Sequence, residues 1–172
     1  MTFGRVAIPA LTVILLVANL SFAAPAQLQD TSRRLYDRVM EEYKHRDYEA
    51  ALAGFRLFVE LHGHSLLAAN AHYWIGECQY RLGRYKDALT TFYNLISYYP
   101  LSSKMPASTL KIGQSYGKLG DRDKARMMYQ RVIEQYPDSV KASVARRAVE
   151  VPSVKTETSL RPIEESAEEL PR

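Results

Sequence analysis

The feature that most constrains this chain is a pattern that recurs three times at a step of 37 residues. Ala51, Ala88 and Ala125 occupy the same place in the three copies. Each copy continues with an aromatic residue four positions later, then a Gly or Pro, then a Ser: Phe55, Phe92, Tyr129, Gly63, Pro100, Pro137, Ser65, Ser102 and Ser139. A fixed period of about 20 to 50 residues is typical of stacked repeat proteins. The pattern therefore predicts an array that holds partners rather than one that performs chemistry.

Each copy also carries two helical patterns, in which apolar residues recur at steps of three and four. The predicted helices cover residues 32–46, 47–62, 66–82, 84–99, 104–119, 121–136 and 140–150. Asp47 is expected to cap the second helix and Ser139 the last. The predicted fold is therefore an all-α solenoid of three helix pairs, at about 32–65, 66–102 and 103–139. The helix at 140–150 is expected to cover its last apolar face.

The two ends of the chain differ from this body. One positive charge in residues 1–5, an almost wholly apolar run from Val6 to Leu20 and the small residues after it predict a secretory signal at 1–26. Cleavage is expected after Ala23 or Ala26, and an uncleaved N-terminal anchor is the alternative. The 15-residue run is short for a membrane span of about 30 Å. Residues 151–172 hold five acidic residues, three basic residues and three prolines, which predicts a disordered acidic tail.

The repeat resembles the tetratricopeptide repeat. The second and third copies carry the resemblance in Ile75-Gly76, Gly83, Tyr85, Ala88, Phe92, Pro100, Ile112-Gly113, Tyr116, Gly120, Ala125, Tyr129 and Pro137. In the first copy, Arg46 stands at the place of the turn glycine. Gly83 and Gly120 are expected to permit a left-handed turn residue, and Gly76 and Gly113 to let the alanine of the second helix pack closely.

The period is 37 residues rather than the usual 34, and the extra residues fall at junctions such as Tyr99-Pro100-Leu101-Ser102 and Tyr136-Pro137-Asp138-Ser139. This longer form is similar to the C-terminal domain of the periplasmic Tol-Pal-associated cell division coordinator family. The resemblance implies a periplasmic interaction module with a protein or peptide partner in the Tol-Pal machinery. Members of that family commonly carry a trimerising coiled coil before the repeats. Here only about ten residues separate the predicted signal from the first helix, which leaves the oligomeric state open. The alternative function is an outer-membrane assembly scaffold held by an uncleaved anchor.

In tetratricopeptide repeats the first helix of each pair lines a concave groove, and this resemblance assigns candidate partner-binding residues. They are Tyr36, Met40, Tyr43, Asn70, Tyr73, Trp74, Glu77, Tyr80, Arg81, Gln114 and Lys118, with Arg33, Asp37, Lys44 and Lys111 at further groove positions. Tyr36, Met40 and Tyr43 share one helix face, as do Tyr73, Glu77 and Tyr80. For Trp74, burial between repeats and exposure in the groove are equally consistent with the sequence.

Other kinds of site have little support. His62, His64 and His72 match no metal-ligand spacing and are expected at the surface, and Cys78 is expected to be a small packed residue without a catalytic histidine. The body of the chain carries 19 basic and 14 acidic residues without a dense basic face, which disfavours nucleic-acid binding. We therefore expect no enzyme activity, no cofactor and no metal.

Overall fold

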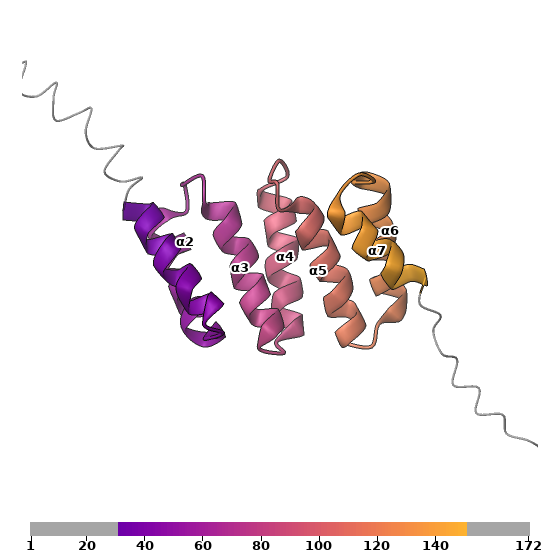
Figure 1. Cartoon of the computed structure of the whole chain (residues 1–172), viewed down its shortest axis with the longest axis horizontal. Coiled ribbons are helices and arrows are strands. Elements are labelled where there is room, and N and C mark those ends of the chain that lie inside the picture. Colours follow the sequence, from indigo (N-terminus) through magenta and orange to yellow (C-terminus); the bar gives the residue numbers. More distant parts are fainter. Residues whose placement is uncertain (1–30, 151–172) are drawn as a thin grey trace, which may run out of the picture.

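The computed structural model describes residues 31–150, and these form an all-α repeat array (Figure 1). The first helix, α1, is described over residues 31–44. It is followed by α2 (Tyr48–His62), α3 (Ala68–Arg81), α4 (Tyr85–Tyr98), α5 (Met105–Lys118), α6 (Arg122–Gln135) and α7 (Val140–Glu150). The predicted fold class, three helix pairs and a final helix, is confirmed. Every helix end within the described part lies within two residues of its predicted position.

The helices form two layers. Each helix packs against the next in the chain, and contacts within one layer join α3 to α5 and α5 to α7. Figure 1 shows α1, α3, α5 and α7 in front, with α2, α4 and α6 behind them. The front helices run in the same direction, so residues 37 positions apart lie at matching heights along the front layer. We call this layer the inner layer.

The core is a series of three apolar clusters, each of which joins consecutive copies. The first contains Phe55, Phe58, Ile75 and Cys78, and the second joins Phe92 and Leu95 to Ile112. In the third, Ala142 and Ala145 of α7 cover Leu110 and Val132. Each copy thus buries an apolar face of its neighbour, where each large side chain removed from water contributes about 1.5–3 kcal/mol. The last helix is the predicted cap, because its two fully buried alanines close the final cluster.

The turns within the helix pairs have a left-handed residue in all three copies. Gly83 has φ 76° and Gly120 has φ 85°, as predicted for the two glycines. Arg46, the equivalent residue of the first copy, has φ 65°. Among residues 31–150 it is the only residue other than glycine with a positive φ. The left-handed region costs a residue with a side chain about 1–2 kcal/mol. The first copy therefore keeps the geometry of the turn without the residue that suits it.

The expected helix caps form as well. Asp47 Oδ1 accepts a hydrogen bond from the backbone N–H of Ala50 at 3.0 Å, and Ser139 Oγ accepts one from the N–H of Ala142 at 3.1 Å. The expected role of Gly76 needs a correction. A Cβ at Gly76 would lie 2.7 Å from ring atoms of Phe92, so the glycine makes room for the aromatic residue of the second helix rather than for its alanine.

Two predicted segments, the signal at 1–26 and the acidic tail at 151–172, lie outside the described residues. Between residues 31 and 150 the structure has no helix long and apolar enough to span a bilayer.

Candidate partner-binding groove

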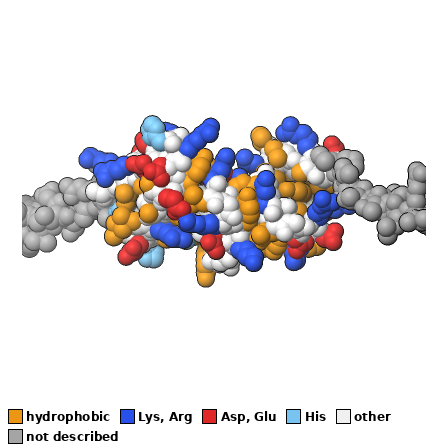
Figure 2. All heavy atoms as spheres, turned by 90° about the horizontal axis from the view of Figure 1, so that it is seen from below, with side chains coloured by type: hydrophobic (Ala, Val, Ile, Leu, Met, Phe, Trp, Pro, Cys, Tyr) orange, Lys and Arg blue, Asp and Glu red, His pale blue; other side chains and the backbone are white. Residues whose placement is uncertain are grey.

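The groove residues of the first two copies recur because the chain repeats every 37 residues. Tyr36 corresponds to Tyr73 and Tyr43 to Tyr80, while Lys44, Arg81 and Lys118 share one repeat position. These residues lie on α1, α3 and α5 of the inner layer. Figure 2, turned so that this layer points upward, shows an outline hollowed at its middle with Lys and Arg side chains in the hollow. The inner layer therefore presents a concave, charged face.

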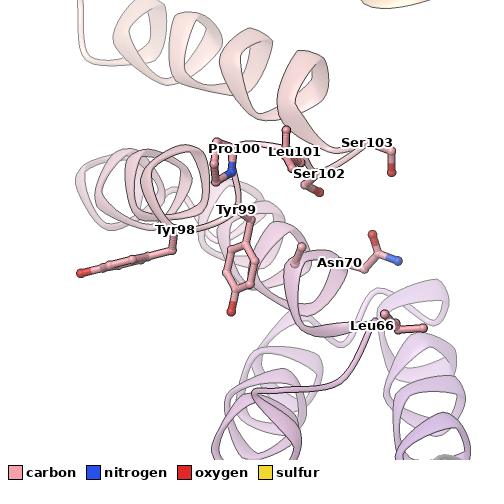
Figure 3. Close-up of a pocket in the computed structure, with 9 residues that line it drawn as sticks. Leu66, Asn70, Tyr98, Tyr99, Pro100, Leu101, Ser102 and Ser103 are labelled. Carbon is pink, nitrogen blue, oxygen red and sulfur yellow. The ribbon is translucent and has the colours of Figure 1, made fainter.

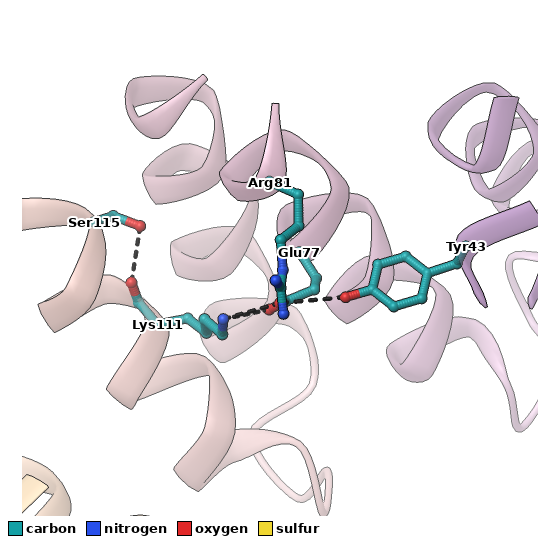
Figure 4. A network of polar contacts seen from close by, with 5 residues as sticks. All are labelled: Tyr43, Glu77, Arg81, Lys111 and Ser115. Carbon is teal, nitrogen blue, oxygen red and sulfur yellow. Dashed lines mark hydrogen bonds and ion pairs between the residues drawn. The ribbon is translucent and has the colours of Figure 1, made fainter. Parts of the chain in front are cut away.

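The centre of this face is a buried carboxylate shared by three helices (Figure 4). Glu77 of α3 is 3% exposed. Its Oε1 accepts hydrogen bonds from Tyr43 Oη of α1 at 3.3 Å, Arg81 Nε at 3.1 Å and Lys111 Nζ of α5 at 2.9 Å. Lys111 Nζ also lies 2.7 Å from Oε2. One carboxylate thus connects all three helix pairs at the bottom of the groove.

This network holds more positive than negative charge. Two cations, Arg81 and Lys111, share the single carboxylate of Glu77. Burial, and then the charge of Glu77, raise the pKa of Tyr43 to about 12, so this phenol stays a hydrogen-bond donor at neutral pH. The hydrogen bond to Glu77 raises the pKa of Arg81. A buried ion pair needs such additional hydrogen bonds to offset the loss of hydration.

Aromatic side chains form the wall of the groove between the first and second copies. Trp74 Nε1 donates a hydrogen bond to Tyr36 Oη at 2.7 Å. The Trp74 ring lies 4.7 Å from that of Tyr43 and 5.3 Å from that of Tyr73, between centroids. Trp74 is half-buried, so both sequence alternatives hold in part: one side packs between repeats and the rest remains accessible.

Lys104, the N-cap residue of α5, and Lys111 of α5 reach back over these rings. Lys104 Nζ lies 5.2 Å from the centroid of Tyr73 and 5.9 Å from that of Trp74, and Lys111 Nζ lies 4.4 Å above Tyr80. Ring faces attract cations at such distances. Lys104 is not among the groove residues predicted from the sequence. Its signal was the seven-residue spacing of Lys104, Lys111 and Lys118, which places all three on one helix face.

The remaining predicted residues are distributed around the network. Tyr73 is 9% exposed and packs against Phe92, so most of its surface belongs to the core. Met40 and Gln114 are half-buried on the inner layer, and Lys118 is exposed at the end of α5. Asn70 lies apart from Glu77, at the side of the array formed by the loops from α2 to α3 and from α4 to α5, which we call the edge. The structure thus brings Tyr43, Glu77, Tyr80 and Arg81 together and leaves Asn70 outside this cluster.

That edge carries two cavities that the sequence did not predict. One, of about 430 Å³, is lined by Asn70, Leu66 and the junction between α4 and α5 (Figure 3). The other, of about 850 Å³, lies between the start of α1 and the loop from α2 to α3. Leu66 borders both cavities and is 93% exposed, and Leu101 is 97% exposed. The edge is therefore apolar, whereas the groove combines rings with charge.

The histidines and the cysteine have structural surroundings. Cys78 is fully buried, as expected, and burial raises its pKa to about 12. His72 is half-buried rather than at the surface, because its ring packs 5.3 Å from that of Tyr99, and burial lowers its pKa. Within residues 31–150 no three His, Cys, Asp or Glu side chains are grouped so that they could hold a metal ion.

The geometry defines a class of protein: an α-helical repeat array with a concave inner layer. Comparison with known protein families identifies the family within this class. The tetratricopeptide repeat family matches residues 36–100 and residues 107–139. These residues form a tetratricopeptide repeat domain, and the chain belongs to that class of protein–protein interaction modules.

Solved structures with the same fold include translocator chaperones of type III secretion. SycD of Yersinia enterocolitica, in complex with a peptide of the translocator YopD, is 17% identical with a TM-score of 0.60, covering 70% of this chain and 87% of SycD. PcrH of Pseudomonas aeruginosa, in complex with the chaperone-binding region of PopB, is 20% identical with a TM-score of 0.59, covering 69% and 94%. The repeat domain of Arabidopsis OM64 is 15% identical with a TM-score of 0.58, covering 72% and 97%. At these identities the likeness shows the fold. No curated protein matches the chain in sequence.

Proposed function

We propose that this protein binds a segment of a partner protein in the groove of its inner layer and performs no catalysis itself. One observation carries the proposal: the cluster of Tyr43, Glu77, Arg81 and Lys111 joins three helix pairs at the bottom of that groove. Rings beside charged groups provide large contact area together with polar selectivity, which is the composition of interface hot spots. The complexes of SycD with a peptide of YopD and of PcrH with the chaperone-binding region of PopB support a peptide-sized partner.

The proposed setting is the periplasm, with a partner in the Tol-Pal cell division machinery. Its support is the signal-like sequence of residues 1–26 and the 37-residue step of the repeats. Fractionation of cells and the mass of the mature N-terminus test the location: loss of about the first 23 or 26 residues is expected. An intact Met1 in the membrane fraction would instead favour the anchored assembly scaffold.

Site-specific photo-crosslinking tests the binding surface. A photoreactive amino acid is placed at Gln114 or Lys118 in the groove, and at Leu57 or Met127 on α2 and α6, which are 46% and 58% exposed. We expect one partner to crosslink at the two groove positions and at neither outer position. Crosslinking to the same partner at Leu57 and Met127 alone would contradict the groove assignment.

A pair of tyrosine variants separates the groove from the apolar edge. Tyr80 is half-buried in the groove, while Tyr98 is 73% exposed beside the edge cavity. Tyr80→Ser is expected to reduce the crosslinked product, and Tyr98→Ser to leave it unchanged. The reverse result would move the binding site to the edge. Equal thermal unfolding of both variants is the control for folding.

A further inference from the structure

The inner layer has an uneven distribution of charge, and this defines the partner further. We propose that the groove takes a partner segment with two parts, an acidic part on α3 and α5 and an apolar part on α1. This inference rests on the proposed function and names the chemistry of the ligand. The two parts are inferred by comparing, for each inner helix, the number of Lys and Arg side chains with the number of carboxylates that pair with them.

On α5 and α3 the cations outnumber the carboxylates. Arg81 and Lys111 share Glu77. Neither Lys104 nor Lys118 has a carboxylate within ion-pair distance in the part of the chain that the structure describes, 31–150. Rings instead of carboxylates hold Lys104, and a ring face positions an ammonium group without neutralising its charge. This half of the groove therefore has a surplus of positive charge.

On α1 the groove positions are neutral. Arg33 pairs with Asp37 at 2.9 Å, and Lys44 pairs with Glu41 at 2.7 Å, both within the helix. Tyr36 and Met40 between them are half-buried and pack against the first core cluster. The α1 half thus has rings and a thioether without free charge. A nucleic acid needs a continuous basic track, so this interruption favours a protein segment.

The spacing of the lysines suggests the pattern of the ligand. Lys104, Lys111 and Lys118 follow each other at seven residues, or about 10.5 Å along a helix at about 1.5 Å per residue. A polyproline-II segment advances about 3.1 Å per residue with three residues per turn, so carboxylates at every third residue lie on one face and recur at about 9.3 Å, close to this spacing. A partner helix matches it with a carboxylate at every seventh residue.

Two synthetic peptides test the inference with the full chain. The first is a fluorescein-labelled 15-residue peptide with Leu and Phe in one half and Glu at every third position of the other. The second is identical except that Gln replaces each Glu. Trp74 is the only tryptophan, so its fluorescence reports occupancy of the groove directly, and anisotropy of the label gives the affinity.

We expect the Glu peptide to bind at least tenfold more tightly than the Gln peptide, to change Trp74 emission and to weaken as salt is raised. The double variant Lys104→Gln/Lys118→Gln should lose about tenfold for the Glu peptide and little for the Gln peptide, since two solvent-accessible contacts are removed. Lys86→Gln on α4, an exposed lysine of the other layer, is the matched control and should change neither affinity.

Equal affinity for the two peptides, or no effect of the double variant, would overturn the acidic preference. If groove crosslinking to a partner persisted in the same double variant, the proposed function would stand and this inference alone would fail. Stronger binding of a single-stranded 15-nucleotide DNA than of the Glu peptide would also overturn it. So would binding of the Glu peptide only after deletion of residues 151–172, because the chain's own acidic segment would then be the occupant.

Discussion

The left-handed turn at Arg46 gives a prediction whose sign can be worked out from the structure. Arg46 has φ 65°, close to the values of Gly83 and Gly120 in the other two copies. Its side chain is exposed and forms no ion pair with another described residue. Replacement by glycine therefore removes strain and loses no contact. We expect Arg46→Gly to stabilise the protein.

The magnitude is the difference between two effects. A side chain in the left-handed region costs about 1–2 kcal/mol, and the greater freedom of glycine in the unfolded chain costs about 0.5–1 kcal/mol. The midpoints of these ranges give an expected net gain for Arg46→Gly of about 0.75 kcal/mol, within limits of about 0 to 1.5 kcal/mol, or a rise in Tm of about 2–4 °C. Gly83→Ala should lose about the same amount. A Cβ at Gly83 would meet no atom within 4 Å, so backbone strain is its only cost.

The assay is urea unfolding followed by circular dichroism, with Arg56→Gly as the matched control. Arg56 is also exposed but lies within α2, where glycine is expected to cost about 1 kcal/mol. The same substitution should therefore have opposite signs at the two sites. A loss of stability in Arg46→Gly as large as that in Arg56→Gly would refute the reasoning.

Three further predictions concern buried polar groups. Ser108 Oγ is buried without a hydrogen-bond partner among residues 31–150, so Ser108→Ala should stabilise the domain by about 1 kcal/mol. Ser115→Ala should not stabilise it, because this change removes a 2.8 Å hydrogen bond to the Lys111 carbonyl. Urea unfolding measures both effects. Burial lowers the pKa of His72, so the unfolded chain binds a proton at this residue more tightly than the folded chain, and the free energy of unfolding decreases as pH falls below the unfolded pKa of about 6.5. His72→Gln should therefore show a weaker pH dependence of unfolding between about pH 7 and 5. An unchanged slope would contradict this prediction. Cys78, with its pKa at about 12, should react with N-ethylmaleimide at pH 8 only as fast as the domain opens, and rapid labelling of the native protein would refute its burial.

The fold could be predicted because its determinants are periodic. The alignment of Ala51, Ala88 and Ala125 established the repeat, and the steps of three and four within each copy located the helices. Asp47 and Ser139 were recognisable as caps because their side chains accept hydrogen bonds from backbone N–H groups only three residues away. The role of Gly76 was less accessible, since it depends on which side chain of α4 approaches, and that is Phe92.

The site could be predicted in part, for a related reason. Tyr43, Glu77 and Arg81 follow from helix faces and the repeat period, which place them on the inner layer. The seven-residue spacing places Lys104 on the groove face, but it does not show which rings the side chain covers, because these rings belong to the preceding copy. Tyr73 has the spacing of a groove residue, yet Phe92 packs against it and buries it. Spacing identifies the face, but only packing between copies determines how much of each side chain remains accessible.

The central claim is that the inner layer is the binding surface, and chemical-shift mapping tests it most directly. The peptide identified by groove crosslinking is titrated into the isotope-labelled chain, and backbone amide shifts are followed. The largest changes are expected on α3 and α5 around Glu77 and Lys111, with smaller ones on α1 and none on α2, α4 or α6 away from the groove. Changes confined to the loops at the edge, around Leu66 and Leu101, would contradict the account.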